Sequence, residues 1–218
     1  SSNGCDSRPV TIGDTVNETE AMALALELAT TPGVPLGPNP RVGCVLLRDG
    51  QLLAQGYHRG AGGPHAEVDA LAHCDDSRGA TAVVTLEPCN HHGRTGPCSL
   101  ALIDAGVTRV VFALADPNPV AAGGAETLRA AGVDVVGPLW EDKARAVNRA
   151  WLFGVRHARP LVTWKFAATL DGRSAALDGT SQWITGPEAR ADVHRLRGQC
   201  DVILVGTGTV VVDDPVLT

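Results

Sequence analysis

Three side chains that favour a metal ion constrain this chain more than any other feature. His65 begins the tripeptide H-A-E, and Cys89 and Cys98 bracket a glycine-containing loop in which each cysteine follows a proline. One imidazole and two thiolates are the ligand set of a tetrahedral Zn²⁺ site whose fourth position stays open to water. A fold that uses them together must bring the segment around residue 65 against the segment at residues 89–98.

Glu67 lies two residues after His65, close to the predicted metal but with no need to bind it. A carboxylate at that place can take a proton from an activated water molecule and give it to a departing amine. The order H-x-E followed by P-C and a second cysteine is typical of zinc-dependent deaminases. Eight residues separate Cys89 from Cys98, where the common form of the motif has two.

A structural zinc, or a pair of cysteines that only pack in a core, is the alternative interpretation of these residues. Structural zinc sites usually have four protein ligands. His91 or His92 is available as a fourth ligand, but neither has a compelling spacing. The glutamate beside the ligand histidine favours the catalytic interpretation.

Composition excludes several classes of protein. The 218 residues are 44% hydrophobic and carry a formal net charge of −6, which fits one or two domains with a packed core. The chain has no basic block, which argues against nucleic-acid binding, and no apolar run approaches the length of a membrane span. Residues 1–16 have no signal-peptide pattern and are predicted to be a flexible tail. Cys44 and Cys200 lie in apolar stretches and are predicted to be buried thiols, a usage typical of a cytoplasmic protein.

The order of predicted elements indicates a layered α/β domain. Asp49-Gly50 is a hairpin signal between two apolar runs. Strands are predicted at 42–47, 52–57, 80–86, 109–115 and 133–136, and helices at 20–29, from residue 65 onward, at 98–105 and at 125–131. An opening hairpin followed by strands that alternate with helices predicts a sheet whose later part is parallel.

The remaining residues are predicted to form a connector and a second segment. Residues 140–156 are predicted to form one helix that Arg159-Pro160 ends. A strand and turn at 162–175, a helix at 187–197 and the apolar run at 201–210 follow. About 60 residues are few for an independent core.

The motifs around the ligands resemble the pyrimidine deaminase half of bacterial riboflavin-biosynthesis deaminase/reductase proteins. They are P-N-P-R-V-G at 38–43, G-Y-H at 56–58, P-H-A-E at 64–67, E-P-C-N-H-H-G-R-T-G-P-C at 87–98 and D-P-N-P at 116–119. Residues 161–218 resemble the opening of the same family's NADPH-dependent reductase domain, in K-F-A-A-T-L-D-G-R, S-Q-W-I-T-G, D-V-I-L-V-G-T-G-T-V and D-D-P-V-L-T.

This resemblance implies a fold and a domain division. It implies a cytidine deaminase-like three-layer α/β domain at 17–150, then a connector and the first part of a dihydrofolate reductase-like α/β reductase domain at 151–218. In the deaminase fold, the two metal-bearing segments open neighbouring helices, whose N-termini favour thiolate over thiol.

The resemblance also implies the substrate contacts of the deaminase part: Asn39, His58, His91, Arg94 and Asn118. An amide such as that of Asn39 can pair with a pyrimidine edge, although an asparagine between two prolines is also a common turn residue. His91 and Arg94 lie between the two cysteine ligands and would form a small basic site for a phosphorylated substrate. The D-P-N-P segment that contains Asn118 is first of all a turn signal.

In the second segment, the resemblance implies contacts with substrate and with NADPH. The substrate positions are Ser181, Arg197 and Leu217, and the NADPH positions are Ala167, Trp183, Thr209 and Asp213. Trp183 as a core residue and Arg197 as a helix-face charge are the alternatives. G-T-G-T-V is not a full dinucleotide fingerprint, and no phosphate-binding element follows it up to Thr218. The printed chain is therefore expected to deaminate without reducing.

The function that this resemblance implies is the zinc-dependent hydrolytic deamination of 2,5-diamino-6-ribosylamino-4(3H)-pyrimidinone 5′-phosphate in riboflavin biosynthesis. Zn²⁺ would be held by His65, Cys89 and Cys98, with Glu67 as the proton carrier. The family's second reaction reduces the ribosyl group with NADPH. The expected partners are a phosphorylated pyrimidine and further copies of the chain in a homodimer or higher homo-oligomer, without nucleic acid or membrane. The alternatives are a deaminase of another nucleoside, base or tRNA, and a truncated remnant with a structural zinc.

Overall fold

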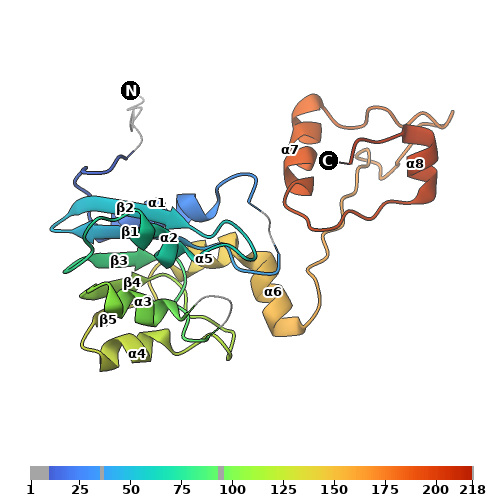
Figure 1. The fold of residues 1–218 in the computed structure, drawn as a ribbon. Helices are drawn as coiled ribbons and strands as arrows, with labels where there is room; N and C mark the ends of the chain where they lie inside the picture. Colours follow the sequence, from blue (N-terminus) through green and yellow to red (C-terminus); the bar gives the residue numbers. More distant parts are fainter. Residues whose placement is uncertain (1–9, 35–36, 93–95, 218) are drawn as a thin grey trace. The chain divides into compact units, whose positions relative to one another are not determined.

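A computed structural model describes residues 10–34, 37–92 and 96–217 and divides the chain into two compact units, residues 1–160 and 161–218 (Figure 1). The first unit has a five-stranded sheet in the order β2-β1-β3-β4-β5. Its strands are β1 (Gly43–Arg48), β2 (Gln51–Tyr57), β3 (Thr81–Val84), β4 (Arg109–Phe112) and β5 (Asp134–Val136). Its helices are α1 (Glu18–Ala29), α2 (Ala66–Ala72), α3 (Cys98–Asp104), α4 (Gly124–Ala130), α5 (Glu141–Val147) and α6 (Arg149–His157).

The sheet changes from antiparallel to parallel along its width. β1 pairs with both β2 and β3 in antiparallel fashion, whereas β3–β4 and β4–β5 are parallel. Asp49 and Gly50 join β1 to β2 with φ angles of 52° and 76°, and positive values at both turn residues are those of the hairpin turn that Asp-Gly favours. The predicted hairpin and the predicted parallel part of the sheet are both confirmed.

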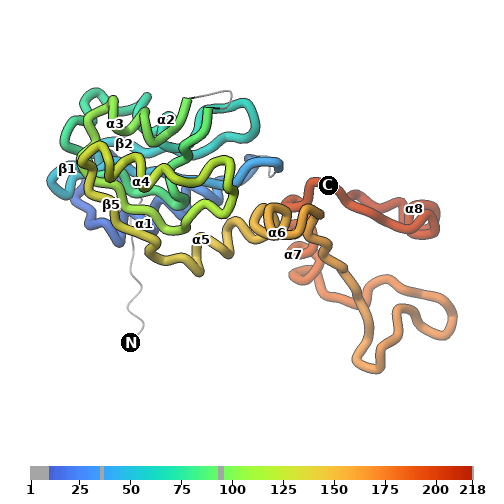
Figure 2. Tube along the Cα trace, turned by 90° about the horizontal axis from the view of Figure 1, so that it is seen from below, coloured from blue at the N-terminus to red at the C-terminus, as the bar shows by residue number. Residues whose placement is uncertain are grey.

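Helices cover both faces of the sheet, which gives the predicted three layers. Helices α1 and α5 contact each other on one face, and α2, α3 and α4 form the other layer (Figure 2). The central strands β1, β3 and β4 are almost wholly buried, as expected for apolar runs enclosed between two helical layers. The edge strand β2 alternates between buried and more exposed residues. Asn17 begins α1 with a capping box in which Glu20 is the reciprocal partner.

A glycine allows α2 to lie close against the sheet. A Cβ atom on Gly56 in β2 would lie 2.3 Å from the backbone nitrogen of Ala70 in α2. The missing side chain therefore fixes how near α2, and the side chains that it carries, can approach the strand.

Residues before α1 also belong to the fold. The Gly13 N–H donates to the Leu52 carbonyl at 2.8 Å, and the Val16 N–H donates to the Gly50 carbonyl at 2.7 Å. The prediction of a flexible tail over 1–16 does not hold for these residues. Residues 1–9 lie outside the described part of the chain.

The predicted single helix at 140–156 is wrong, because Asn148 divides it into α5 and α6. Asn148 is 3% exposed. Its Nδ2 donates to the Arg41 carbonyl at 2.9 Å, and its Oδ1 accepts the Arg41 N–H at 2.8 Å. The side chain thus pairs with the backbone of a distant segment while its own backbone leaves the helical conformation, at φ −104° and ψ 20°. Helical periodicity in the sequence carries no sign of such a long-range bond.

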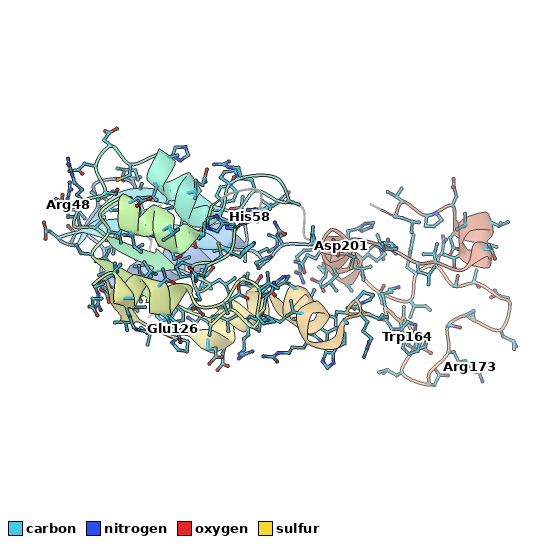
Figure 3. The ribbon with its side chains drawn as sticks, turned by 60° about the horizontal axis from the view of Figure 1, so that its bottom comes forward. Arg48, His58, Glu126, Trp164, Arg173 and Asp201 are labelled. Carbon is cyan, nitrogen blue, oxygen red and sulfur yellow. The ribbon has the colours of Figure 1, made fainter. Side chains whose placement is uncertain are left out.

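The second unit contains α7 (Pro187–Arg197) and α8 (Thr207–Asp213). The helix predicted at 187–197 is confirmed, whereas the strand predicted within 162–175 does not form. Its turn does form, with the Gly172 N–H donating to the Thr169 carbonyl at 2.9 Å. No side chain among residues 161–217 is buried, so no apolar layer is present to hold a strand. Trp164, labelled in Figure 3, is 81% exposed.

The cysteine prediction is half correct. Cys44 is buried, but Cys200 is exposed, so the prediction for Cys200 is wrong. The apolar stretch that follows Cys200 lies in the unit that buries none of its side chains. Across the described parts of the chain, helices reach neither the length nor the apolar character that a membrane crossing requires.

Candidate metal centre

The three predicted ligands converge, although they come from three separate places in the chain. His65 is the N-cap of α2, Cys98 is the first residue of α3, and Cys89 lies on the loop after β3. The His65 Nδ1 atom lies 3.2 Å from the Cys98 sulfur and 3.4 Å from the Cys89 sulfur. Both sulfurs are buried. Helix α2 packs against β3 and α3, which places the loop after β3 beside α2 and so assembles the cluster.

The donor set and its spacing fit a zinc ion. Zinc bonds of about 2.1 Å to nitrogen and about 2.3 Å to sulfur give a tetrahedral nitrogen–sulfur edge of about 3.6 Å. The observed separations are close to that edge. Among the residues that the structure describes, only this group brings three potential ligand atoms within 4.8 Å of one another. The three residues leave one tetrahedral position for a non-protein ligand.

The two thiols have opposite pKa shifts. A hydrogen bond from the Cys98 thiol lowers the pKa of the Cys89 thiol to about 4 against the opposing effect of burial, and His65 lowers it further. The same hydrogen bond and then burial raise the pKa of the Cys98 thiol. The hydrogen bond with Cys89 raises the pKa of His65. Cys89 therefore loses its proton more readily than Cys98, and a divalent cation would supply the charge that favours both sulfurs as thiolates.

Glu67 lies in the first turn of α2 and is 4% exposed. Burial is the largest cause that raises the pKa of its carboxyl group to about 7, and the negative charge of Cys89 adds to the shift. A carboxyl group with a pKa near neutrality is suited both to accept and to donate a proton. The predicted proton carrier therefore lies beside the ligand cluster.

A cavity of about 370 Å³ opens beside these residues, which is a common size for a small-molecule site. Four of the predicted substrate contacts line it: Asn39, His58, His91 and Asn118. Arg94 lies outside the described residues, so its predicted role stays a prediction. Glu87, Asp116 and Trp151 also line the cavity, although no pattern in the sequence assigns them a role there. Trp151 comes from α6, which the sequence presented only as part of a connector.

Asn39 and His58 form a linked pair on the cavity wall. His58, labelled in Figure 3, is 6% exposed. Its Nδ1 lies 2.8 Å from the Pro64 carbonyl, and its Nε2 lies 2.9 Å from the Asn39 Nδ2. The His58 ring also meets the His65 ring edge-on, with centroids 5.5 Å apart. Both ring nitrogens of His58 therefore already have protein partners, and the pair joins the P-N-P loop to the metal-bearing turn.

His91 differs from His58 in its hydrogen bonding. Its Nδ1 is buried and has no partner among the described residues. An unpaired ring nitrogen in the cavity wall is a candidate contact for a polar ligand, because leaving it unpaired costs free energy.

All the predicted reductase positions lie in the second unit. Arg197 donates to the Val216 carbonyl at 3.2 Å, next to Leu217, and the Arg190 guanidinium lies 4.5 Å from the centre of the Trp183 ring. Trp183 is 69% exposed, so it is not a core residue of this unit. The remaining predicted positions are Ala167, Ser181, Thr209 and Asp213, of which the last two share α8.

Comparisons with known proteins account for most of the chain. Residues 15–114 match the family model for the cytidine and deoxycytidylate deaminase zinc-binding region, and residues 160–218 match the model for the RibD C-terminal domain. The riboflavin biosynthesis protein RibD of Escherichia coli K12 is 51% identical over 199 residues, which cover 90% of this chain and 54% of the relative. The chain is thus similar to RibD proteins in both of its matched parts. This similarity agrees with the zinc ligand set that the fold assembles.

Two further relatives are similar to this chain over nearly the same share of its length. The Mycobacterium tuberculosis H37Rv protein is 51% identical over 202 residues, 91% of this chain and 60% of the relative. A solved structure from Thermotoga maritima, a diaminohydroxyphosphoribosylaminopyrimidine deaminase/5-amino-6-(5-phosphoribosylamino)uracil reductase, is 41% identical with a TM-score of 0.86. The match includes 91% of this chain and 58% of the solved chain. The chain thus spans little more than half the length of the RibD relatives that it matches.

Proposed function

We propose that this chain carries out the deamination step of riboflavin biosynthesis, the hydrolysis of 2,5-diamino-6-ribosylamino-4(3H)-pyrimidinone 5′-phosphate to the corresponding uracil and ammonia. The observation that carries the proposal is the buried Glu67 carboxyl beside a His65, Cys89 and Cys98 cluster on the wall of one cavity. We assign residues 17–150 to this reaction.

The proposed mechanism uses Glu67 twice. Zinc held by His65, Cys89 and Cys98 would supply Lewis-acid activation of a water molecule. The Glu67 carboxylate accepts a proton as the water oxygen attacks the ring carbon that bears the amine. Glu67 then donates that proton to the departing nitrogen, the carbon–nitrogen bond breaks, and ammonia leaves. The pKa of about 7 supports both steps, because neither protonation state is strongly favoured near neutral pH.

We assign the polar cavity residues to substrate recognition. Asn39 and Asn118 offer amide groups to the pyrimidine and the sugar, with His58 beside them. His91 and the predicted Arg94 would meet the phosphate, an anion that favours charged or hydrogen-bonding partners. The unpaired Nδ1 of His91 supports that assignment.

The second part of the proposal concerns residues 151–218. We assign 151–160 to a connector and the rest to the first part of an NADPH-dependent reductase domain, the family's domain for converting the ribosyl group to ribityl; the residues printed here are not expected to carry out that reduction alone. The match to the RibD C-terminal domain supports this assignment. Ala167, Trp183, Thr209 and Asp213 would meet NADPH. Ser181, Arg197 and Leu217 would meet the substrate.

Assembly and location complete the proposal. Trp164, Phe166 and Leu170 are 81%, 59% and 111% exposed, and apolar surface of this kind favours a partner. We therefore include a homodimer or higher homo-oligomer, which sedimentation at several concentrations would test. The free thiol of buried Cys44 and the thiolate ligands support a reducing, cytoplasmic location.

A substrate panel tests the deamination. Ammonia release is measured with zinc-loaded protein on the diaminopyrimidinone 5′-phosphate, its dephosphorylated form, cytidine and deoxycytidylate, and metal content is measured by mass spectrometry. The proposal expects one zinc per chain and a preference of at least about tenfold in kcat/KM, about 1.4 kcal/mol, for the phosphorylated diaminopyrimidinone. Equal or better turnover of cytidine or deoxycytidylate would contradict it.

A further inference from the structure

We infer that Glu87 is a positioning residue that holds one wall of the substrate cavity against the metal-bearing loop. The wall is the segment 116–118, which contributes Asp116 and Asn118 to the cavity lining. The kinetic part of this inference rests on the proposed deaminase function. Its geometric part can be tested without any substrate.

Both carboxyl oxygens of Glu87 bind backbone amides of later segments. Oε2 accepts the Asp116 N–H at 3.2 Å, and Oε1 accepts the Ala125 N–H at 3.0 Å. Glu87 is 9% exposed, and its own N–H donates to the Leu114 carbonyl at 2.8 Å. Ala125 lies in the first turn of α4, the helix that carries the labelled Glu126 in Figure 3. The Glu87 side chain thus joins the loop that contains Cys89 to Asp116 and to Ala125, which lie on either side of the turn before α4.

The position of Asp116 then determines the position of Asn118. The Asp116 Oδ1 atom accepts the Asn118 N–H at 2.8 Å, and the Asn118 Oδ1 atom accepts the Val120 N–H at 3.2 Å. A displacement of the Asp116 backbone therefore moves the amide that we assign to substrate binding.

Two further contacts hold the same loops together, but neither depends on the Glu87 side chain. The Asn90 N–H donates to the Ala121 carbonyl at 2.8 Å. Gly124 packs so closely on the Pro88 carbonyl that a Cβ atom would lie 1.7 Å from its oxygen. Loss of the Glu87 contacts should therefore loosen the wall while the loops stay together.

A purely structural role for Glu87 is the competing explanation, and Asp69 provides the matched control. Asp69 is also a buried carboxyl group, 6% exposed. It accepts the Tyr57 N–H at 3.1 Å and is paired with Arg59 at 3.3 Å. Asp69 is not among the residues that line the cavity. Its substitution should therefore weaken the contact between α2 and the end of β2 without moving the wall at 116–118.

The test compares Glu87→Gln with Asp69→Asn. An amide keeps one acceptor oxygen but turns a donor toward the other N–H, so one of the two Glu87 bonds is lost. We expect Glu87→Gln to raise KM for the diaminopyrimidinone phosphate roughly tenfold with a smaller change in kcat and unchanged zinc content, on the scale of one buried hydrogen bond. Hydrogen exchange should accelerate at Asp116 or Ala125. Asp69→Asn likewise loses one acceptor, toward either Tyr57 or Arg59, and should raise KM clearly less than Glu87→Gln does, without faster exchange at Asp116 or Ala125.

A double-mutant cycle separates positioning from general stability. If Glu87 acts through the wall, Glu87→Gln should add little to the KM of Asn118→Ala. Full additivity, an unchanged KM in Glu87→Gln, or an equal rise in Asp69→Asn would each overturn the inference.

Two outcomes have their own tests. If Glu87→Gln does not fold, Ala125→Pro removes one amide donor at a first-turn position that tolerates proline, and it should raise KM in the same way; an unchanged KM would overturn the inference. If the wild-type chain does not deaminate the pyrimidine, the proposed function fails and exchange alone decides. Faster exchange confined to Asp116 or Ala125 would then support the positioning role, and unchanged protection would overturn it.

Discussion

Replacing Asn148 with alanine should destabilise the first unit, residues 1–160, by about 2–4 kcal/mol. Asn148 is 3% exposed and pairs with both backbone groups of Arg41, at 2.8 and 2.9 Å. Alanine would leave the Arg41 N–H and carbonyl without these partners, and each unsatisfied buried group costs about 1–3 kcal/mol. The lower half of the summed range applies, because Arg41 is only half-buried and water can replace part of the loss.

The free energy of unfolding is measured by urea denaturation, followed by circular dichroism, on wild-type protein, Asn148→Ala and Arg149→Ala. Arg149 is the exposed neighbour in α6, and a substitution there should change stability by less than about 0.5 kcal/mol. Arg41 is also two residues from Asn39, so Asn148→Ala should raise KM for the pyrimidine substrate. A loss of stability below about 0.5 kcal/mol would refute the argument, because it would mean that the two bonds are replaced without cost.

Three further substitutions test the site. Glu67→Gln should keep zinc and fold but lower kcat by about 10²-fold or more, the scale of a general acid–base group; near-normal turnover would remove Glu67 from the mechanism. Arg94→Ala should raise KM for the phosphorylated substrate and not for its dephosphorylated form, which steady-state kinetics on both will show; equal effects would rule out the phosphate role. Gly56→Ala should cost about 1–3 kcal/mol in urea denaturation, because its Cβ would lie 2.3 Å from the Ala70 nitrogen and 2.6 Å from the Ala66 oxygen; unchanged stability would show that α2 can move away freely.

The elements that the sequence predicted well are those with strong local signals. Asp49-Gly50 determines the β1–β2 turn through its own backbone preferences, and the apolar runs of β3 and β4 follow from enclosure between two helical layers. The three metal ligands were found for a different reason. Zinc accepts few kinds of side chain, so His65, Cys89 and Cys98 are recognisable by type and spacing alone.

The errors in the second unit have one physical origin. The strand predicted within 162–175 and the buried thiol predicted at Cys200 both rest on apolar residues in the sequence. Apolar residues predict burial only where other surfaces cover them, and residues 161–217 bury none of their side chains. The helix at 187–197 was predicted correctly because Pro187 at its first position favours a helix start without needing tertiary contacts.

The walls of the cavity depend on a kind of contact that periodicity does not reveal. Glu87 reaches the backbone of Ala125, and Asn148 reaches the backbone of Arg41, across 38 and 107 positions in the chain. Sequence patterns report neighbours at the helical or strand repeat, and Glu and Asn are ordinary surface residues when taken alone. Once the fold is known, burial distinguishes them, because a buried polar side chain that satisfies a distant backbone group fixes two segments at once. Both residues hold segments that line the cavity beside the metal ligands, so residues of this kind decide whether the recognisable ligands would meet the proposed substrate in the right place.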